Sequence, residues 1–199
     1  MTHRMVILAA GEGSRLRPLT DERPKCLMEV AGKPLIEWQM EAASRQGLGE
    51  VAVVTGYKAD MFKQRGCRWY HNLRYAETNM VESLWCAKDE FHGEIIVSYG
   101  DILYEDSVLM ALIASEAPIS VVVDVEWRCY WEARFADPMS DAESLRLNGD
   151  GCILEIGQKT VTIEEVQGQY IGLMKFRDTG IVTLQEVYAG LADCQVVGR

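Results

Sequence analysis

A glycine-rich stretch near the start of the chain carries residue types that suit an anion-binding site. Gly11 and Gly13 are followed by the cationic side chains Arg15, Arg17 and Lys25. Glycines let the backbone turn sharply and approach a ligand, which leaves peptide N–H groups free to hydrogen-bond phosphate oxygens. In a chain of net charge −10, such a cationic cluster indicates a phosphate site. A turn with a few solvated cations is the alternative.

The residues before the glycines have the composition of a buried strand. Residues 4–9 form a short apolar run with β-branched side chains, which predicts a strand that ends where the glycines begin. An open α/β sheet binds its ligand at the carboxyl ends of its strands. The glycines therefore lie where such a sheet would hold a ligand.

Two common glycine motifs are excluded. The P-loop requires a Lys-Ser or Lys-Thr pair, and Gly32-Lys33-Pro34 has neither the hydroxyl nor the earlier glycine. The dinucleotide fingerprint requires a glycine or alanine three residues after Gly13, where this chain has Leu16. A large side chain at that position would obstruct helix–strand packing.

Strand-like and helix-like segments alternate along the chain. We expect strands at residues 51–55, 67–70, 94–99, 119–125 and 170–176, and helices at 34–46, 60–64, 81–91, 106–115 and 179–191. Asp106 or Ser107 is the expected cap of the fourth helix. A hairpin between residues 143–147 and 152–156 is predicted by the turn at residues 148–151. The pattern is typical of an α/β fold: a Rossmann-like, doubly wound, mostly parallel sheet with a small inserted β-hairpin.

The overall composition limits the partners. Thirty acidic against twenty basic residues disfavour nucleic acid and an anionic membrane as partners. No run of eighteen apolar residues and no N-terminal signal is present, so we expect a soluble, cytoplasmic protein. The six cysteines form no CxxC pair, which favours scattered reduced thiols over a zinc or redox motif.

A second candidate group follows another predicted strand. Gly100 and Asp101 come directly after residues 95–99, so the carboxylate of Asp101 should project from the same sheet edge as the glycine loop. A carboxylate oxygen that faces a triphosphate is a natural Mg²⁺ ligand. A turn-forming or helix-capping aspartate is the alternative.

The chain resembles a known enzyme family between residues 8 and 36. The motif is Leu8-Ala9-Ala10-Gly11-x-Gly13-x-Arg15-Leu16-x-Pro18-Leu19-Thr20, then Pro24-Lys25-x-Leu27 and Gly32-Lys33-Pro34-Leu35-Ile36. It resembles the opening of the sugar-1-phosphate and phosphocholine-type nucleotidyltransferases. The resemblance implies that the glycine loop, Arg15 and Lys25 hold the triphosphate of an incoming nucleotide, and that Asp101 binds Mg²⁺.

The resemblance also implies a nucleotide-binding set. The backbone of residues 8–11 and the segment 77–84 would contact the base. This segment, with Asn79 and Ser83, resembles the Asn-x-x-x-Ser-Leu element of the phosphocholine cytidylyltransferase branch, which favours CTP. As an alternative, Asn79 and Ser83 only open the following helix. Gly56 and Tyr57 end the second predicted strand at the same edge and join the nucleotide-binding candidates.

The acceptor candidates lie later in the chain. Lys159 resembles a family lysine that contacts the acceptor phosphate, although a lone lysine is often a solvated charge. Trp127, Tyr130 and Trp131 are interleaved with acidic residues, a combination that holds ammonium groups through cation–π attraction. They therefore favour phosphocholine or an aminophosphonate as the acceptor, with core packing of the aromatic rings as the alternative.

Taken together, the sequence predicts an enzyme that moves a nucleoside monophosphate from CTP to a small phosphorylated acceptor and releases pyrophosphate. Arg15, Lys25 and Asp101 are the expected catalytic residues, and no general base is required because the acceptor phosphate is already an anion. A sugar-1-phosphate uridylyl- or thymidylyltransferase and a non-catalytic nucleotide-binding regulatory subunit are the alternatives. A homodimer is left open.

One domain is expected over residues 1–199, with a nucleotide-binding half at 1–125 and an acceptor-binding half at 126–199. The family's second metal carboxylate comes from a Glu-x-Asp-type motif after the final helix, and residues 193–199 contain no such motif. The missing motif implies that the acceptor-binding half is short. Three explanations are open: the chain is truncated, Asp101 alone holds the metal, or catalysis is weak.

Overall fold

A computed structural model describes residues 3–62, 67–159 and 162–193. Its main element is a six-stranded sheet of order β5-β4-β1-β6-β10-β7. These strands are β1 (His3–Ala9), β4 (Glu50–Thr55), β5 (Arg68–His71), β6 (Glu94–Tyr99), β7 (Ile119–Asp124) and β10 (Gln169–Arg177). Strand β1 pairs in parallel with β4 and β6, and β4 with β5, whereas β10 is antiparallel to β6. The predicted α/β class with a mostly parallel sheet is confirmed.

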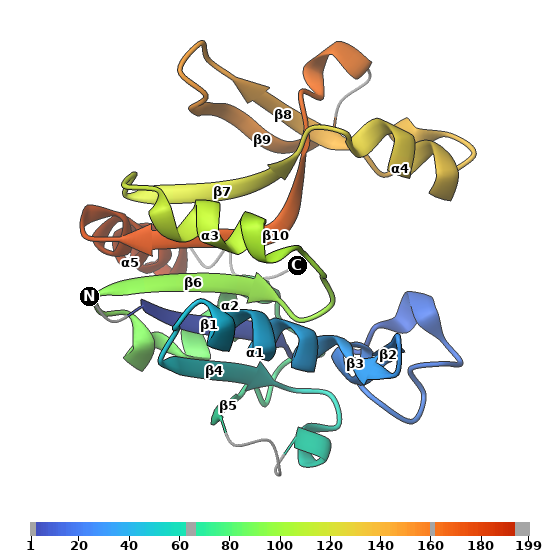
Figure 1. Ribbon diagram of the computed structural model, residues 1–199, viewed down its shortest axis with the longest axis vertical. Helices are drawn as coiled ribbons and strands as arrows, with labels where there is room; N and C mark the ends of the chain where they lie inside the picture. The colour runs from blue at the N-terminus through green and yellow to red at the C-terminus, as the bar shows by residue number, and fades with distance from the viewer. Residues whose placement is uncertain (1–2, 63–66, 160–161, 194–199) are drawn as a thin grey trace. The chain divides into compact units, whose positions relative to one another are not determined.

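Helices cover both faces of the sheet. Figure 1 shows α1 (Leu35–Arg45) and α3 (Asp106–Ala114) in front of it, and α2 (Met80–Cys86) and α5 (Thr179–Asp193) behind it. The rear core joins the strands to α2 and α5 and contains Val6, Val54, Leu84, Ile95, Phe176 and Ile181. Alternating strands and helices thus bury an apolar layer on either side of β1, as the doubly wound pattern requires.

The chain divides into two compact units. The first comprises Met1–Ser120 and Gly172–Arg199, and the second is Val121–Ile171. The second contains α4 (Trp127–Arg134) and the predicted hairpin, formed by β8 (Glu143–Leu147) and β9 (Ile153–Lys159). The sequence analysis placed everything after residue 125 in the acceptor-binding half. In the structure, the end of β10 and all of α5 belong to the first unit, because they complete its sheet and its rear core.

Some local expectations were wrong. Helix α2 ends at Cys86 instead of continuing to Phe91, and a short 3₁₀ turn (Lys88–Glu90) follows. That turn directs the buried Glu90 carboxylate toward Arg68 (2.6 Å) and Tyr70 (2.7 Å). Neither Asp106 nor Ser107 caps α3, because its N-cap is Glu105, which makes no side-chain cap bond.

Three further points concern the sequence expectations. The short helix expected at 60–64 is a 3₁₀ turn at Ala59–Phe62, and residue 64 lies outside the described residues. Cys86, Cys129 and Cys152 are free thiols. Cys194 and the C-terminal segment that was expected to lack the metal motif lie outside the described residues. Among the described residues, no helix is both long and apolar enough to cross a membrane.

Candidate active site

A cavity of about 340 Å³ lies at the carboxyl ends of β1 and β6. Nine sequence-predicted residues line it, namely Leu8, Ala9, Ala10, Gly11, Gly13, Arg15, Lys25, Ser83 and Asp101. The sequence analysis did not assign six other lining residues to the site: Ser14, Leu16, Cys26, Met80, Tyr99 and Gly100. Each of these except Tyr99 is adjacent in sequence to a predicted site residue, and Tyr99 is two positions from Asp101, so proximity along the chain was the available signal.

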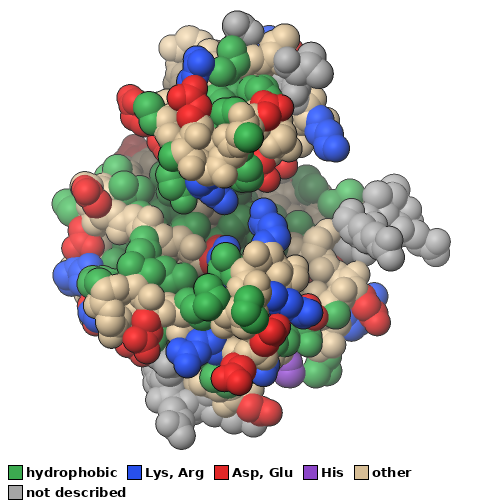
Figure 2. Space-filling view, turned by 90° about the vertical axis from the view of Figure 1, so that its right-hand side faces the viewer, with side chains coloured by type: hydrophobic (Ala, Val, Ile, Leu, Met, Phe, Trp, Pro, Cys, Tyr) green, Lys and Arg blue, Asp and Glu red, His purple; other side chains and the backbone are tan. Residues whose placement is uncertain are grey.

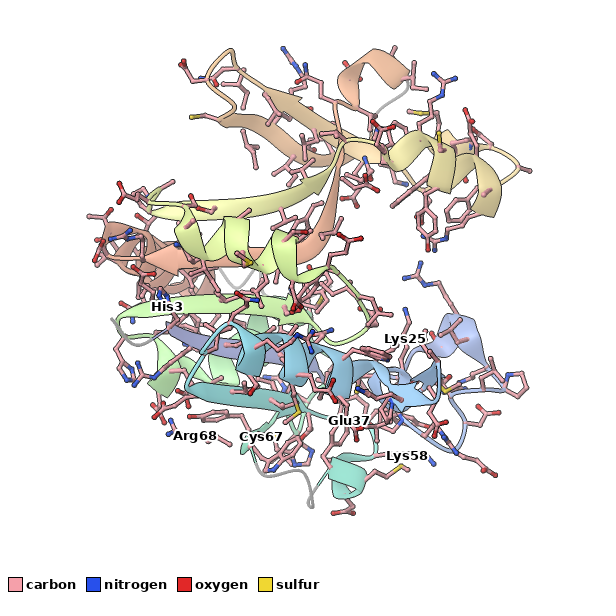
Figure 3. The ribbon with its side chains drawn as sticks, viewed as in Figure 1. His3, Lys25, Glu37, Lys58, Cys67 and Arg68 are labelled. Carbon is pink, nitrogen blue, oxygen red and sulfur yellow. The ribbon has the colours of Figure 1, made fainter. Side chains whose placement is uncertain are left out.

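The position of the cavity follows from the parallel strands. Figure 3 places Lys25 beyond the carboxyl ends of the strands and His3 at the opposite edge of the sheet. On the face that Figure 2 presents, Lys and Arg side chains are scattered among Asp and Glu side chains. The net charge of −10 is therefore no obstacle to a cationic site, because Arg15 and Lys25 are gathered at the cavity.

Gly13 shapes the loop that borders the cavity. Its φ is 64°, in the left-handed region that favours glycine, and it precedes a 3₁₀ turn at Ser14–Leu16. The carbonyl of Gly13 accepts hydrogen bonds from the Leu16 N–H at 2.9 Å and from the Thr20 hydroxyl at 3.0 Å. A Cβ at Gly13 would lie 3.1 Å from Cβ of Lys25. The glycine therefore lets the loop pack directly against the segment that carries the lysine.

Lys25 and Asp101 meet within this cavity. The lysine Nζ donates to Oδ2 of Asp101 at 2.5 Å, and the two side chains are 33% and 34% exposed. Lys25 begins a 3₁₀ turn whose other residues, Cys26 and Leu27, are buried and anchor it. Both groups are accessible from the cavity, so the lysine can bind a polyanion and the carboxylate can bind its metal ion.

Gln39 supports the turn that presents Asp101. This residue of α1 is 1% exposed, and its Nε2 donates to the carbonyl oxygens of Tyr99 (2.9 Å) and Ile102 (2.8 Å). Its Oε1 accepts from the Ser98 hydroxyl at 2.9 Å, which fixes the orientation of the amide. The sequence analysis missed this role, and a glutamine on the apolar side of a predicted helix was the only signal.

Gly56 and Tyr57 contact the backbone of the glycine loop and of the segment that follows it. The Tyr57 N–H donates to the Ala10 carbonyl at 3.0 Å, and its hydroxyl lies 3.1 Å from the carbonyl oxygens of both Thr20 and Asp21. A Cβ at Gly56 would be 2.7 Å from the Ala10 oxygen. These two residues therefore support the loop, and the cavity lining does not include them.

The cationic cluster divides between two environments. Arg15 is exposed and lines the cavity. Arg17 instead pairs with Glu12 at 3.0 Å and with Asp21 at 3.5 Å. Arg15 and Lys25 are thus the cations that the described residues bring to the cavity.

Asn79 and Ser83 have different roles. The Asn79 Oδ1 accepts from the N–H groups of Val81 (3.0 Å) and Glu82 (3.2 Å), so Asn79 is the N-cap of α2, as the alternative interpretation stated. Ser83, one turn later on the same helix, is 5% exposed and lines the cavity.

The acceptor candidates all belong to the second unit. Trp127 is 3% exposed, packs against Ala142 and Val166, and donates its indole N–H to the Val166 carbonyl at 3.2 Å. The expectation that Trp127 presents its ring to an acceptor is wrong, because the ring is buried in this small core. Removing a large indole ring from water stabilises the fold more than leaving it exposed.

The other aromatic candidates lie nearer the surface. Tyr130 is 56% exposed, but the Arg134 guanidinium lies 5.1 Å from its ring centroid and 5.4 Å from that of Trp131. The rings already contact a cation of the chain itself. Lys159 is exposed at the end of β9, opposite Glu143.

Comparison with known proteins identifies the family. A model described as the MobA-like NTP transferase domain matches residues 5–162. The chain belongs to this family. The match includes every residue that lines the cavity.

Individual relatives narrow the activity. The chain is 41% identical over 182 residues to the CTP:phosphoglutamine cytidylyltransferase of Campylobacter jejuni, covering 86% of this chain and 72% of the relative. It is 35% identical over 107 residues to the choline-phosphate cytidylyltransferase of Streptococcus pneumoniae, covering 52% of this chain and 47% of the relative. The chain is accordingly a nucleotidyltransferase of the cytidylyltransferase type.

A solved structure supports the fold independently. The CTP:phosphocholine cytidylyltransferase of Streptococcus pneumoniae superposes with a TM-score of 0.65 at 22% identity, covering 96% of this chain and 79% of that structure. At this identity the likeness concerns the fold, and it agrees with the Rossmann-like arrangement predicted from the sequence.

Proposed function

We propose that the chain transfers CMP from CTP to a small phosphorylated acceptor. The observation that carries this proposal is the cavity that gathers Arg15, Lys25 and Asp101 beside the glycine loop. In the reaction, an acceptor phosphate oxygen forms a bond to the α-phosphorus of CTP. The bond from that phosphorus to the bridging oxygen breaks, and pyrophosphate leaves with the electron pair.

Electrostatics accounts for the roles of the two cations. The reaction brings two anions together and builds negative charge on the α-phosphoryl oxygens and on the departing pyrophosphate. Arg15 and Lys25 would bind those oxygens and stabilise that charge, while the backbone N–H groups of Gly11 and Gly13, which line the cavity, would orient the triphosphate. An acceptor phosphate is ionised at neutral pH, so the mechanism requires no strong general base.

A divalent metal fits the residues of the cavity. Enzymes of this family generally use one. Among residues 3–62, 67–159 and 162–193, no cluster of three or more His, Cys, Asp or Glu side chains could hold a metal ion. A single carboxylate suits Mg²⁺, which takes one or two carboxylates and otherwise phosphates and water. Asp101 would hold this ion, which when bound neutralises phosphate charge.

The acceptor is a small phosphate or phosphonate that carries an amide or ammonium group. The names of two relatives point to this class, since they act on phosphoglutamine and choline phosphate. In the second unit, exposed Lys159 could pair with an acceptor phosphate, and Tyr130 and Trp131 could contact its cationic group in exchange for Arg134.

Pyrophosphate release tests the proposal. The purified chain with Mg²⁺ is offered CTP, UTP, dTTP, ATP and GTP, each with phosphoglutamine, phosphocholine, 2-aminoethylphosphonate and glucose 1-phosphate. Release that is fastest with CTP and a nitrogen-bearing acceptor is the expected result. Release confined to UTP or dTTP with glucose 1-phosphate would instead establish a sugar-1-phosphate nucleotidyltransferase. Nucleotide binding by calorimetry without release in any pair would favour the non-catalytic regulatory subunit.

A further inference from the structure

The Ser83 hydroxyl has a defined hydrogen-bond polarity in the cavity. Its oxygen accepts a hydrogen bond from Nδ2 of Asn72 at 3.0 Å, and its proton is donated to the Asn79 carbonyl at 3.3 Å. A hydroxyl has one proton and two acceptor positions. One acceptor position therefore remains for a ligand, and Ser83 has no second proton to offer.

Asn72 is itself fixed in one orientation. It is 4% exposed, directly after β5, and its backbone N–H donates to the Thr55 carbonyl at 2.8 Å. Its Oδ1 accepts the backbone N–H of Arg74 at 2.9 Å, so the amide nitrogen must face the other way, toward Ser83 and Thr78. The Thr78 hydroxyl donates to the Arg74 carbonyl at 2.8 Å and can therefore only accept from Asn72. Every proton in this network has a single direction.

We propose that Asn72 is a positioning residue that holds Ser83 as a hydrogen-bond acceptor toward the nucleotide base. A pyrimidine with an exocyclic amino group can donate to the free position on Ser83. A pyrimidine with a carbonyl oxygen there would place one acceptor against another, unless Ser83 gave up its bond to the Asn79 carbonyl. A substrate that leaves a buried polar group of the site unpaired is bound less tightly and is therefore rejected. The network thus selects cytosine over uracil or thymine.

This inference rests on the proposed function, because it assumes that a nucleotide occupies the cavity with its base against Ser83. Met80, from the same first turn of α2, is 48% exposed and also lines the cavity, so it offers an apolar contact to the plane of a base there. The network belongs to α2 and to the segment between β5 and α2, and Ser83 is its member that lines the cavity.

Three nucleotides test the polarity on the unaltered chain. CTP, UTP and the 2-pyrimidinone nucleoside triphosphate, which has neither an amino nor an oxo group at that position, are compared by kcat/KM and by equilibrium binding. The expected order is CTP, then the pyrimidinone, then UTP. UTP equal to or better than the pyrimidinone would overturn the inference, since the acceptor on Ser83 would then impose no penalty.

Variants test the part played by Asn72. Asn72→Ala and Ser83→Ala should each lower the CTP-to-UTP ratio of kcat/KM about tenfold, the equivalent of one hydrogen bond. Thr78→Val is the matched control, because it removes the other acceptor of the same Asn72 amide without touching Ser83, and it should leave the ratio unchanged. In the double variant Asn72→Ala/Ser83→Ala, the ratio should equal that of Ser83→Ala alone.

The outcomes separate this inference from the proposed function. A general loss of stability lowers turnover with both nucleotides and leaves their ratio unchanged, so a reduced ratio marks selection. If Asn72→Ala does not fold, the nucleotide series and Ser83→Ala still decide. Pyrophosphate release with an unchanged ratio in Ser83→Ala would overturn the inference and leave the proposed function standing. If no pyrophosphate is released but CTP binds more tightly than UTP, and Ser83→Ala abolishes this difference, the inference stands and the proposed function is overturned.

Discussion

The ammonium nitrogen of Lys25 lies 2.5 Å from Oδ2 of Asp101, although the two residues are 76 positions apart in the sequence. Each side chain supplies the counter-charge that the other needs while no nucleotide is bound. A triphosphate attracts the lysine and a metal ion attracts the carboxylate, so binding of both would exchange one ion pair for two. The pairing makes this part of the cavity close to neutral, which limits the desolvation cost of keeping two charges together.

Lys25→Ala should lower the rate of pyrophosphate release at saturating CTP by about 100-fold or more, because it removes a cation from the developing charge on the phosphates. Lys88→Ala is the matched control, since Lys88 is an exposed lysine outside the cavity lining. Initial rates are measured on both variants after circular dichroism shows native folding. A Lys25→Ala rate within a few-fold of the unaltered chain would refute the electrostatic role.

Asp101→Asn should raise the Mg²⁺ concentration needed for half-maximal activity by about tenfold or more, because a neutral amide is a weaker ligand for a hard cation. Without metal, CTP binding should not weaken, since a negative charge beside the triphosphate has been removed. A Mg²⁺ titration of the rate and calorimetry in chelator measure the two effects. Asp89→Asn, at an exposed position in the 3₁₀ turn after α2, is the control. An unchanged Mg²⁺ requirement would exclude Asp101 as the metal ligand.

Gly56→Ala should destabilise the fold by about 1–3 kcal/mol, the usual cost of overpacking. The added Cβ would lie 2.5 Å from Cβ of Tyr75 and 2.7 Å from the Ala10 oxygen, so the loop must shift. Nucleotide affinity should fall as well, because Ala10 lines the cavity. Gly49→Ala is the control, since its Cβ would meet open space and its φ is not in the left-handed region. Urea unfolding and CTP calorimetry check both effects, and equal stability of the two variants would count against this account.

Stability should depend on Asp106 at neutral pH and lose that dependence in acid. The Arg45 guanidinium donates to both oxygens of Asp106, at 2.6 and 2.7 Å, and lowers the pKa of that carboxyl below its ordinary 3.8. A carboxyl with a depressed folded pKa stabilises the fold above its unfolded pKa and loses this contribution as the pH falls through the folded pKa. The melting temperature of Asp106→Asn should therefore be lower than that of the unaltered chain at pH 7.

The same comparison in acid completes this test. As the pH falls through the depressed folded pKa of Asp106, which lies below 3.8, the two melting temperatures should converge, because the unaltered carboxyl then also becomes neutral. Asp89→Asn provides the baseline for loss of a surface charge. A gap between Asp106→Asn and the unaltered chain that is as wide in acid as at pH 7 would show that the carboxylate charge is not its cause.

The convergence of the glycine loop and Asp101 could be predicted from the sequence, because each follows an apolar run and parallel strands end at one edge. The supporting groups could not. Gln39 acts through Tyr99 and Ile102, which are 60 and 63 positions away, and Asn72 acts through Ser83 on the following helix. In neither case does the single polar residue indicate its partner in the sequence. Asp106 shows the same limit, since its pairing with Arg45 replaced the expected helix cap.

Trp127 shows how composition can mislead. Aromatic and charged residues alternate around it, and the pattern fitted a cation-binding surface as well as it fitted a small core. Helix α4 turns Trp127 inward and leaves Tyr130 exposed, a difference of helical phase that could not be assigned before the helix itself was known.

The second unit, Val121–Ile171, is one uninterrupted stretch of chain, whereas every residue that lines the cavity precedes Ile102. Insertions, deletions or wholesale replacement between the end of β7 and the start of β10 therefore leave the sequence of the cavity intact. Under the proposed function, in which the second unit binds the acceptor, related chains can change their acceptor while they keep the same nucleotide site. This segment should therefore diverge faster than residues 8–101.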